Sequence, residues 1–256
     1  MIKKGHFIEI SYTGIIKEGN LVFDTTDEKI AKENNIFNPK AEYGPVVICV
    51  GQGQLIKGFD ADLVGKELNK EYEVEISPEN AFGKKSAQLL KLVPTNIFIK
   101  QNIVPQPGLQ VNIDNNIGII KTVTGGRTIV DFNHPLSGKE VIYKYKVTKI
   151  INDTVEKIKS LLSIILNISK KDIEVKYEAG KAEVSMIKMP EFIQIEMIKK
   201  IKELIPEIKE VKFVEAGKKE DAENAQKTTK ISGVSKTNVS GHKETAVEGK
   251  RPKKSN

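Results

Sequence analysis

The stretch that decides the fold is Gly51-Gln52-Gly53-Gln54-Leu55-Ile56-Lys57-Gly58-Phe59-Asp60. It follows the apolar run 46–50, which is typical of a buried strand that ends at a glycine. Apolar residues then recur at helical spacing and Gly65 follows, so we expect a short helix over 54–63. The pattern is therefore a strand, a glycine-containing turn and one short helix.

Further strands are expected on both sides of this unit. Alternating apolar residues predict strands over 7–16, 72–76 and 141–150. Glu18-Gly19-Asn20 predicts a turn into a returning strand at 21–23. The polar residues 27–45 indicate a long loop with one helical turn. We expect these segments to form an antiparallel sheet wrapped on the short helix.

The composition of the sequence changes between residues 84 and 131. Proline and glycine pairs, such as Pro107-Gly108 and Gly125-Gly126, separate short segments of strand-forming residues. The expected strands are 110–113, 118–123 and 128–132. We therefore expect a small inserted β-domain over 85–131, which interrupts a domain formed by 1–84 and 132–151.

Residues 152–215 have the pattern of a separate α+β domain. The expected elements are a helix over 154–167, a hairpin of strands 172–177 and 181–186 around Ala179-Gly180, a helix over 191–204 opened by Pro190, and a strand over 210–214. Residues 216–256 contain no aromatic side chain and are rich in lysine, so we expect them to be disordered. The predicted fold class is α+β.

Composition excludes several classes of function. The chain has 41 Lys and Arg against 34 Asp and Glu, a net charge of +7, of which residues 216–256 contribute most. Arg127 and Arg251 are the only arginines, which argues against sequence-specific recognition of nucleic acid. Cys49 is the only cysteine, so an internal disulfide is impossible. With no apolar run long enough to span a membrane and no signal segment, we expect a cytoplasmic protein without a membrane partner.

Common catalytic sets are also missing from the sequence. His6, His134 and His242 are the only histidines, and they form neither a metal-binding motif nor a triad pattern. No phosphate-binding glycine loop is present, and no cofactor or metal is expected. Prolyl isomerisation remains open, because it needs an apolar pocket with few polar groups rather than a nucleophile.

Three motifs in order carry a resemblance to a known family. Val22-Phe23-Asp24-Thr25-Thr26, the stretch 51–60, and Ile76-Ser77-Pro78-Glu79-Asn80-Ala81-Phe82-Gly83 together resemble the FKBP-type peptidyl-prolyl cis/trans isomerases. The interruption after Gly83 resembles the SlyD-like subgroup, which has an insert-in-flap domain. The block 152–215 resembles the C-terminal extension of long-type archaeal members, which implies self-association as a homodimer.

The resemblance implies the functional residues of this chain. It implies a catalytic pocket formed by Tyr12, Phe23, Asp24, Ile56, Phe59, Phe82 and Tyr143. It implies substrate contacts from Val46, Leu55, His134 and Leu136, and from Ile97 and Phe98 in the inserted domain. Phe59 stands where small members have tryptophan, and Phe82 where many have tyrosine. Taken singly, Asp24 could instead cap a turn, the phenylalanines could be core, and His134 could be an exposed turn residue.

The activity that the resemblance implies is isomerisation of prolyl bonds, with chaperone activity on unfolded or proline-containing polypeptides. In the family the inserted domain captures unfolded segments and passes prolines to the pocket. Two alternatives stay open from the sequence. The chain could be a non-catalytic holdase chaperone, or it could associate with ribosomes or nucleic acid through its basic tail.

Overall fold

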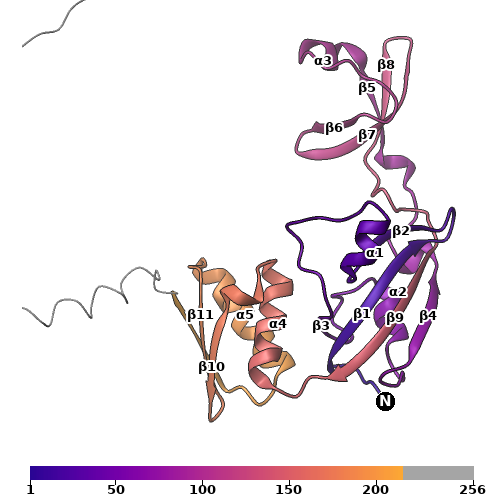
Figure 1. Ribbon diagram of the computed structural model, residues 1–256. Coiled ribbons are helices and arrows are strands. Elements are labelled where there is room, and N and C mark those ends of the chain that lie inside the picture. The colour runs from indigo at the N-terminus through magenta and orange to yellow at the C-terminus, as the bar shows by residue number, and fades with distance from the viewer. Residues whose placement is uncertain (216–256) are drawn as a thin grey trace, which may run out of the picture. The chain divides into compact units, whose positions relative to one another are not determined.

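The computed structural model describes residues 1–215 and contains three sheets (Figure 1). The expectation of disorder for 216–256 lies outside the described residues. In the first sheet, β1 (Phe7–Ile16) pairs antiparallel with β9 (Val141–Ile150) along one edge and with β2 (Leu21–Thr25) and β3 (Val46–Cys49) along the other. The strand β4 (Glu71–Ile76) pairs antiparallel with β9, which completes the expected antiparallel sheet.

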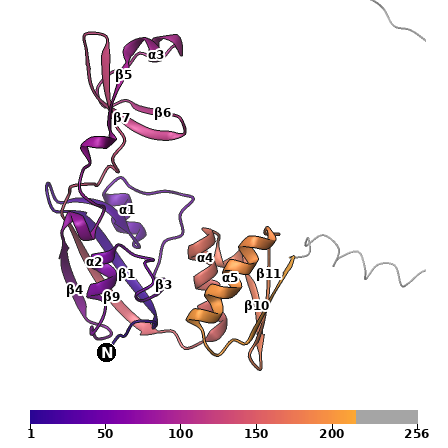
Figure 2. The same cartoon turned by 180° about the vertical axis from the view of Figure 1, so that it is seen from behind.

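The helix α2 (Lys57–Asp62) packs against one face of this sheet, as Figures 1 and 2 show. Because side chains alternate along a strand, Ile8 and Ile10 of β1 and Tyr143 of β9 point to that face and bury Phe59 of α2. A second short helix, α1 (Glu28–Glu33), lies in the long polar segment and is capped by Asp27, whose carboxylate accepts from two backbone N–H groups.

The predicted helix over 54–63 begins later than expected, at Lys57. Gly51 and Gly53 have positive φ angles of 83° and 67°, and Ile56 is extended at φ −59° and ψ 145°. Residues 54–56 therefore form the end of a loop, although their apolar spacing continues that of the helix. The short helix places Phe59 in the core with no exposed surface.

The inserted segment forms a four-stranded antiparallel sheet of order β5-β8-β7-β6. Its elements are β5 (Leu90–Pro94), α3 (Thr95–Lys100), β6 (Gln110–Ile113), β7 (Asn116–Thr124) and β8 (Arg127–Asp131). The helix α3 was not expected. It inserts Phe98 among Val111, Ile120 and Val130, so Phe98 is 2% exposed and serves as core of the insert. Phe98 was expected to contact substrate, but in this structure it lies in the core of the insert.

The third sheet has the order β10-β11-β12, and both helices of this region cover the same face (Figure 2). The elements are α4 (Thr154–Leu166), β10 (Glu174–Glu178), β11 (Lys181–Met186), α5 (Glu191–Leu204) and β12 (Glu210–Glu215). Ala179 and Gly180 both have positive φ, as a two-residue hairpin turn requires. Phe7, Val47 and Cys49, whose side chains leave the first core, share the hydrophobic cluster of this region.

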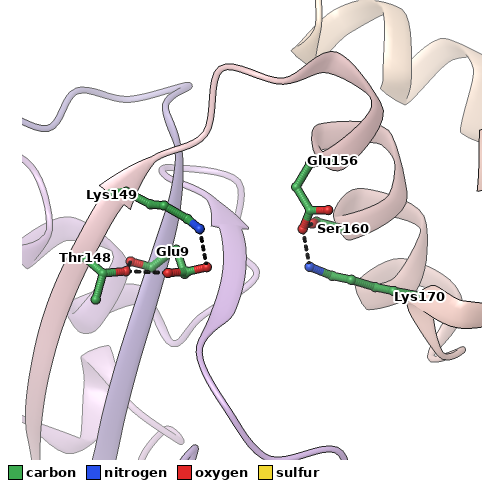
Figure 3. A network of polar contacts seen from close by, with 6 residues as sticks. All are labelled: Glu9, Thr148, Lys149, Glu156, Ser160 and Lys170. Atoms are coloured by element: carbon green, nitrogen blue, oxygen red, sulfur yellow. Dashed lines mark hydrogen bonds and ion pairs between the residues drawn. The ribbon is translucent and has the colours of Figure 1, made fainter.

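Two small polar networks fix side chains on β1 and α4 (Figure 3). Glu9 accepts from the Thr148 hydroxyl at 2.7 Å and pairs with Lys149 at 3.0 Å. Burial alone would raise the pKa of Glu9, but these two partners together lower it. On α4, Glu156 accepts from Lys170 at 2.7 Å.

Within residues 1–215 no helix is long and apolar enough to cross a membrane.

Candidate active site

Five aromatic side chains meet at α2, which contributes Phe59, while the other four come from four further segments. The Phe59 ring stacks on Tyr143 with ring centres 4.4 Å apart, and Tyr12 contacts Phe59 edge-on at 5.8 Å. Phe23 lies edge-on to Tyr143 at 5.8 Å and to Phe82 at 5.7 Å. Phe59 and Tyr143 are buried, whereas Tyr12, Phe23 and Phe82 are half-buried. The five rings therefore form an aromatic wall whose inner part, Phe59 and Tyr143, is buried. The half-buried rings of Tyr12, Phe23 and Phe82 form its outer part.

One carboxylate lies at the polar edge of this wall. Burial, and then the nearby Asp24 carboxylate, raise the pKa of Tyr12, so its hydroxyl stays protonated and can donate a hydrogen bond. Tyr143 has a raised pKa for the same two reasons. Burial raises the pKa of Asp24, although its contacts with Tyr12 and the Thr25 backbone oppose that shift. The edge therefore presents hydroxyl donors beside a half-buried carboxyl group.

The two threonines after Asp24 explain why Asp24 lies beside Tyr12. The Tyr12 backbone N–H donates to the Thr26 hydroxyl at 3.0 Å, and the Thr26 backbone N–H donates to the Tyr12 carbonyl at 3.0 Å. The Thr25 hydroxyl also donates to that carbonyl at 3.2 Å. These bonds hold the end of β2 against β1. The threonines of the Phe-Asp-Thr-Thr motif therefore position Asp24, while its phenylalanine forms part of the aromatic wall.

The aliphatic residues of the prediction lie in the same cluster. Val46, Leu55 and Ile56 are half-buried and pack on the core that contains Phe59. His134 stacks on Phe82, with ring centres 4.9 Å apart and an interplanar angle of 1°. Leu136 is half-buried and donates its backbone N–H to His134 Nδ1 at 3.2 Å. The structure therefore brings the isomerase-domain residues of the prediction into one region.

The two predicted contacts in the insert have different surroundings. Ile97 is 43% exposed on α3, whereas Phe98 beside it is core. The exposed apolar side chains of the insert are instead Leu89, Leu90, Leu92, Ile97, Ile99, Val104 and Ile117. A groove of about 490 Å³ is bordered by Leu89, Val93, Ile117 and Phe132. The resemblance implied substrate contacts from the insert at Ile97 and Phe98, but not which of the other apolar residues are exposed.

Two residues that sequence analysis did not select also shape the site. Gly14 lies on β1 opposite Tyr143, and a Cβ there would meet Phe23 Cζ at 2.8 Å. Asp60 is 7% exposed and accepts from the backbone N–H groups of Gly51 and Gly53. A glycine inside a strand can indicate a close approach, so Gly14 carried a weak signal. Nothing in the sequence pattern distinguished Asp60 from an ordinary helix residue.

Among residues 1–215 there is no group of three or more His, Cys, Asp or Glu side chains that could hold an ion. The groups that the aromatic cluster does offer are aromatic rings that can enclose a ligand and the hydroxyl groups of Tyr12 and Tyr143.

Comparison with known proteins shows which family the chain belongs to. A family profile described as FKBP-type peptidyl-prolyl cis-trans isomerase matches residues 1–99, and one described as the FKBP26 IF domain matches residues 91–136. The short-type peptidyl-prolyl cis-trans isomerase of Methanocaldococcus jannaschii is 36% identical over 147 residues, which cover 57% of this chain and 92% of that relative. The chain belongs to the FKBP-type peptidyl-prolyl cis-trans isomerases.

Bacterial members of the family are also similar to this chain in sequence. A probable FKBP-type 16 kDa isomerase of Pseudomonas fluorescens is 32% identical over 108 residues, covering 40% of this chain and 71% of that relative. The SlyD isomerase of Haemophilus influenzae is 27% identical over 161 residues, covering 61% of this chain and 76% of that relative. The sequence-based assignment to FKBP-type isomerases with an insert-in-flap domain is thus confirmed, as is the α+β fold class.

Proposed function

We propose that prolyl isomerisation takes place at the aromatic cluster formed by side chains of β1, β2, β9 and α2 together with Phe82, and we call this cluster the pocket. The observation that carries this proposal is the convergence of Tyr12, Phe23, Phe59, Phe82 and Tyr143 beside one carboxyl group. Amide resonance places partial charges on the carbonyl oxygen and the nitrogen, and it creates a barrier of about 20 kcal/mol to rotation. Water stabilises those partial charges, whereas an apolar enclosure does not.

The rotation therefore becomes easier inside the pocket. A planar imide loses more hydration than a twisted one, because twisting removes the resonance and its charge separation. Binding the twisted form better than either planar form lowers the barrier. Phe82 supplies half-buried apolar surface without the hydroxyl that tyrosine would add, whereas Phe59 is fully buried and supports the rings of Tyr12 and Tyr143 from below. The Tyr12 hydroxyl and the backbone of Leu55 and Ile56 then orient the peptide at the rim.

Isomerisation of an Ala-Leu-Pro-Phe type peptide tests this proposal, with wild type compared with Tyr12→Ala and Asp24→Ala. We expect kcat/KM to fall in both variants while the far-ultraviolet circular dichroism is unchanged. Tyr177→Ala, which removes a partly buried tyrosine from the third sheet, is the matched control and should keep full activity. Wild-type binding of unfolded protein without any catalysis would favour the non-catalytic holdase instead.

A chaperone function of the inserted domain is proposed on a separate observation. Leu92 and Ile117 are 57% and 62% exposed, and with the other exposed apolar residues they form a surface typical of protein binding. Tethering this surface to the pocket would raise the effective concentration of captured prolines near the catalytic site. The domain boundaries 1–84 with 132–151, 85–131 and 152–215 are part of this proposal.

Two variants separate capture from catalysis. Leu92→Gln with Ile117→Gln should weaken binding of an unfolded protein while tetrapeptide turnover is unchanged. Deletion of 86–130 should have the same two effects. Leu68→Gln is the matched control, because Leu68 is 38% exposed but lies outside the insert. Equal losses on peptides and unfolded proteins would contradict this division of labour.

Self-association through residues 152–215 is proposed from the surface of α5. Phe192 and Ile195 lie one turn apart and are 69% and 61% exposed, which is unusual for large apolar side chains in solution. Light scattering should show a dimer that Ile195→Glu dissociates and that Lys202→Glu, on the same helix, does not. A monomer in the wild type would refute this proposal.

A cytoplasmic location is proposed from the lone, buried Cys49, and cell fractionation tests it.

A further inference from the structure

The loop that leads into the pocket is held from inside by one carboxylate. The Gly51 N–H donates to Asp60 Oδ1 at 2.8 Å, and the Gly53 N–H donates to Asp60 Oδ2 at 3.1 Å. A third bond from the Cys49 N–H to Gln54 Oε1, at 2.6 Å, closes the same loop. Asp60 is 7% exposed, so this carboxylate is largely removed from water. Burial of a charged group is costly unless such partners compensate it.

The two glycines make this arrangement possible. Gly51 and Gly53 have φ angles of +83° and +67°, a region that strains residues with a Cβ. Their conformations turn two nearby N–H groups toward one carboxylate, so each oxygen accepts one bond. Charged acceptors form hydrogen bonds roughly twice as strong as neutral ones. The loop conformation thus depends on the charge at residue 60.

The same residue also holds the other end of the loop. Asp60 follows Phe59, and its backbone N–H donates to the Ile56 carbonyl at 3.0 Å. Its side chain therefore holds Gly51 and Gly53, while its backbone holds Ile56. Leu55 and Ile56, whose backbone we propose to orient the substrate, lie between these two attachments. Their orientation relative to Phe59 follows from the Asp60 contacts.

We propose that Asp60 is a positioning residue for isomerisation, which acts by setting the backbone of Leu55 and Ile56 for the substrate peptide. This inference rests on the proposed function of the pocket. The Asp60 carboxylate is buried behind the loop and acts through the backbone N–H groups of Gly51 and Gly53 rather than on the reacting bond. Loss of its charge should therefore weaken peptide binding equally in the ground state and the transition state. Such a loss raises KM and leaves kcat largely unchanged.

Asp60→Asn in the full chain tests the role of the charge with little change in size. Asparagine keeps one oxygen acceptor but presents an NH₂ group to the second backbone N–H, so one bond is lost. We expect KM for an Ala-Leu-Pro-Phe type peptide to rise about tenfold, with kcat within about twofold of wild type. The amide NMR signals of Gly51 and Gly53 should shift, and those of Leu55 and Ile56 should follow.

Asp153→Asn is the matched control, because Asp153 also accepts a backbone N–H, from Glu156 at 2.8 Å, but caps α4. It should leave both constants unchanged. A merely structural role for Asp60 would reduce the folded fraction, so kcat would fall at constant KM, and that result would overturn the inference. An active wild type with an unaltered KM in Asp60→Asn would overturn it too. An inactive wild type would overturn the proposed function and this inference with it.

Discussion

Replacing Gly14 by alanine should lower both the stability of the fold and the activity of the pocket, because the neighbouring rings leave no room for a side chain at this position. Gly14 lies between Asp24 on β2 and Tyr143 on β9. A Cβ built there would come to 2.8 Å from Phe23 Cζ and 3.1 Å from Tyr143 Cε1. Carbon atoms prefer separations of about 3.5 to 4.0 Å. The Phe23 ring would therefore have to move by about 0.7 Å or the strand would have to shift.

The size of the effect follows from two opposing contributions. Overpacking in a core costs about 1–3 kcal/mol, whereas replacing a glycine by alanine in a strand gains about 0.5–1 kcal/mol in conformational entropy. The packing cost is larger because Phe23 is confined by Phe82 and Tyr143, with ring centres 5.7 and 5.8 Å away. We expect the free energy of unfolding to fall by about 1–2 kcal/mol. Displacement of a pocket wall should lower kcat/KM by about tenfold or more.

Urea unfolding and the tetrapeptide assay measure these two quantities on the same samples. Ser11→Ala, on the same strand but outside the first hydrophobic core, is the control and should change stability by less than about 0.5 kcal/mol. Phe23→Leu should partly relieve the strain, so the effects of Gly14→Ala and Phe23→Leu should be non-additive. A Gly14→Ala protein as stable and as active as wild type would refute the reasoning.

Three further predictions follow from the described contacts. Phe59→Ala empties a fully buried position and should lower the free energy of unfolding by about 3–5 kcal/mol, measured in urea. Burial raises the pKa of Asp24, so above about pH 3.9 the folded chain retains a proton that the unfolded chain has lost. Stability should therefore decrease as pH rises through that window, and Asp24→Asn should remove this slope in unfolding curves recorded at several pH values. Burial raises the pKa of Cys49 to about 11, so its thiol should not react with an aromatic disulfide at pH 8 until the chain is unfolded.

Local sequence patterns predicted most elements of the structure because burial on one face imposes a simple repeat. Alternation along 7–16 and 141–150 corresponds to β1 and β9, and the Ala179-Gly180 turn forms the expected hairpin between β10 and β11. The helix α3 was missed because its six residues are too few to show a helical repeat. The start of α2 was placed too early, since Leu55 and Ile56 keep helical spacing while their backbone is extended.

The candidate site was predictable only in part. The motifs around Phe23, Phe59 and Phe82 indicated the family, and the structure brings the rings of these residues into one wall. The roles of Gly14 and Asp60 depend on atoms from other segments, which no spacing along the chain reveals. Phe98 shows the same limit in the insert, where an apolar residue could be core or binding surface until its neighbours are known.

The sequence by itself determined most strands and helices and the family, because these depend on residue spacing and on short motifs; the strand β5 of the insert was not predicted. Only the tertiary structure decided which apolar residues form the pocket, which form the core and which remain exposed on the insert. It also decided that one buried carboxylate holds the loop before α2. The physical reason is that hydrophobic burial and hydrogen bonding act between neighbours in space, and residues such as Gly14 and Phe23 become neighbours only when the sheet assembles.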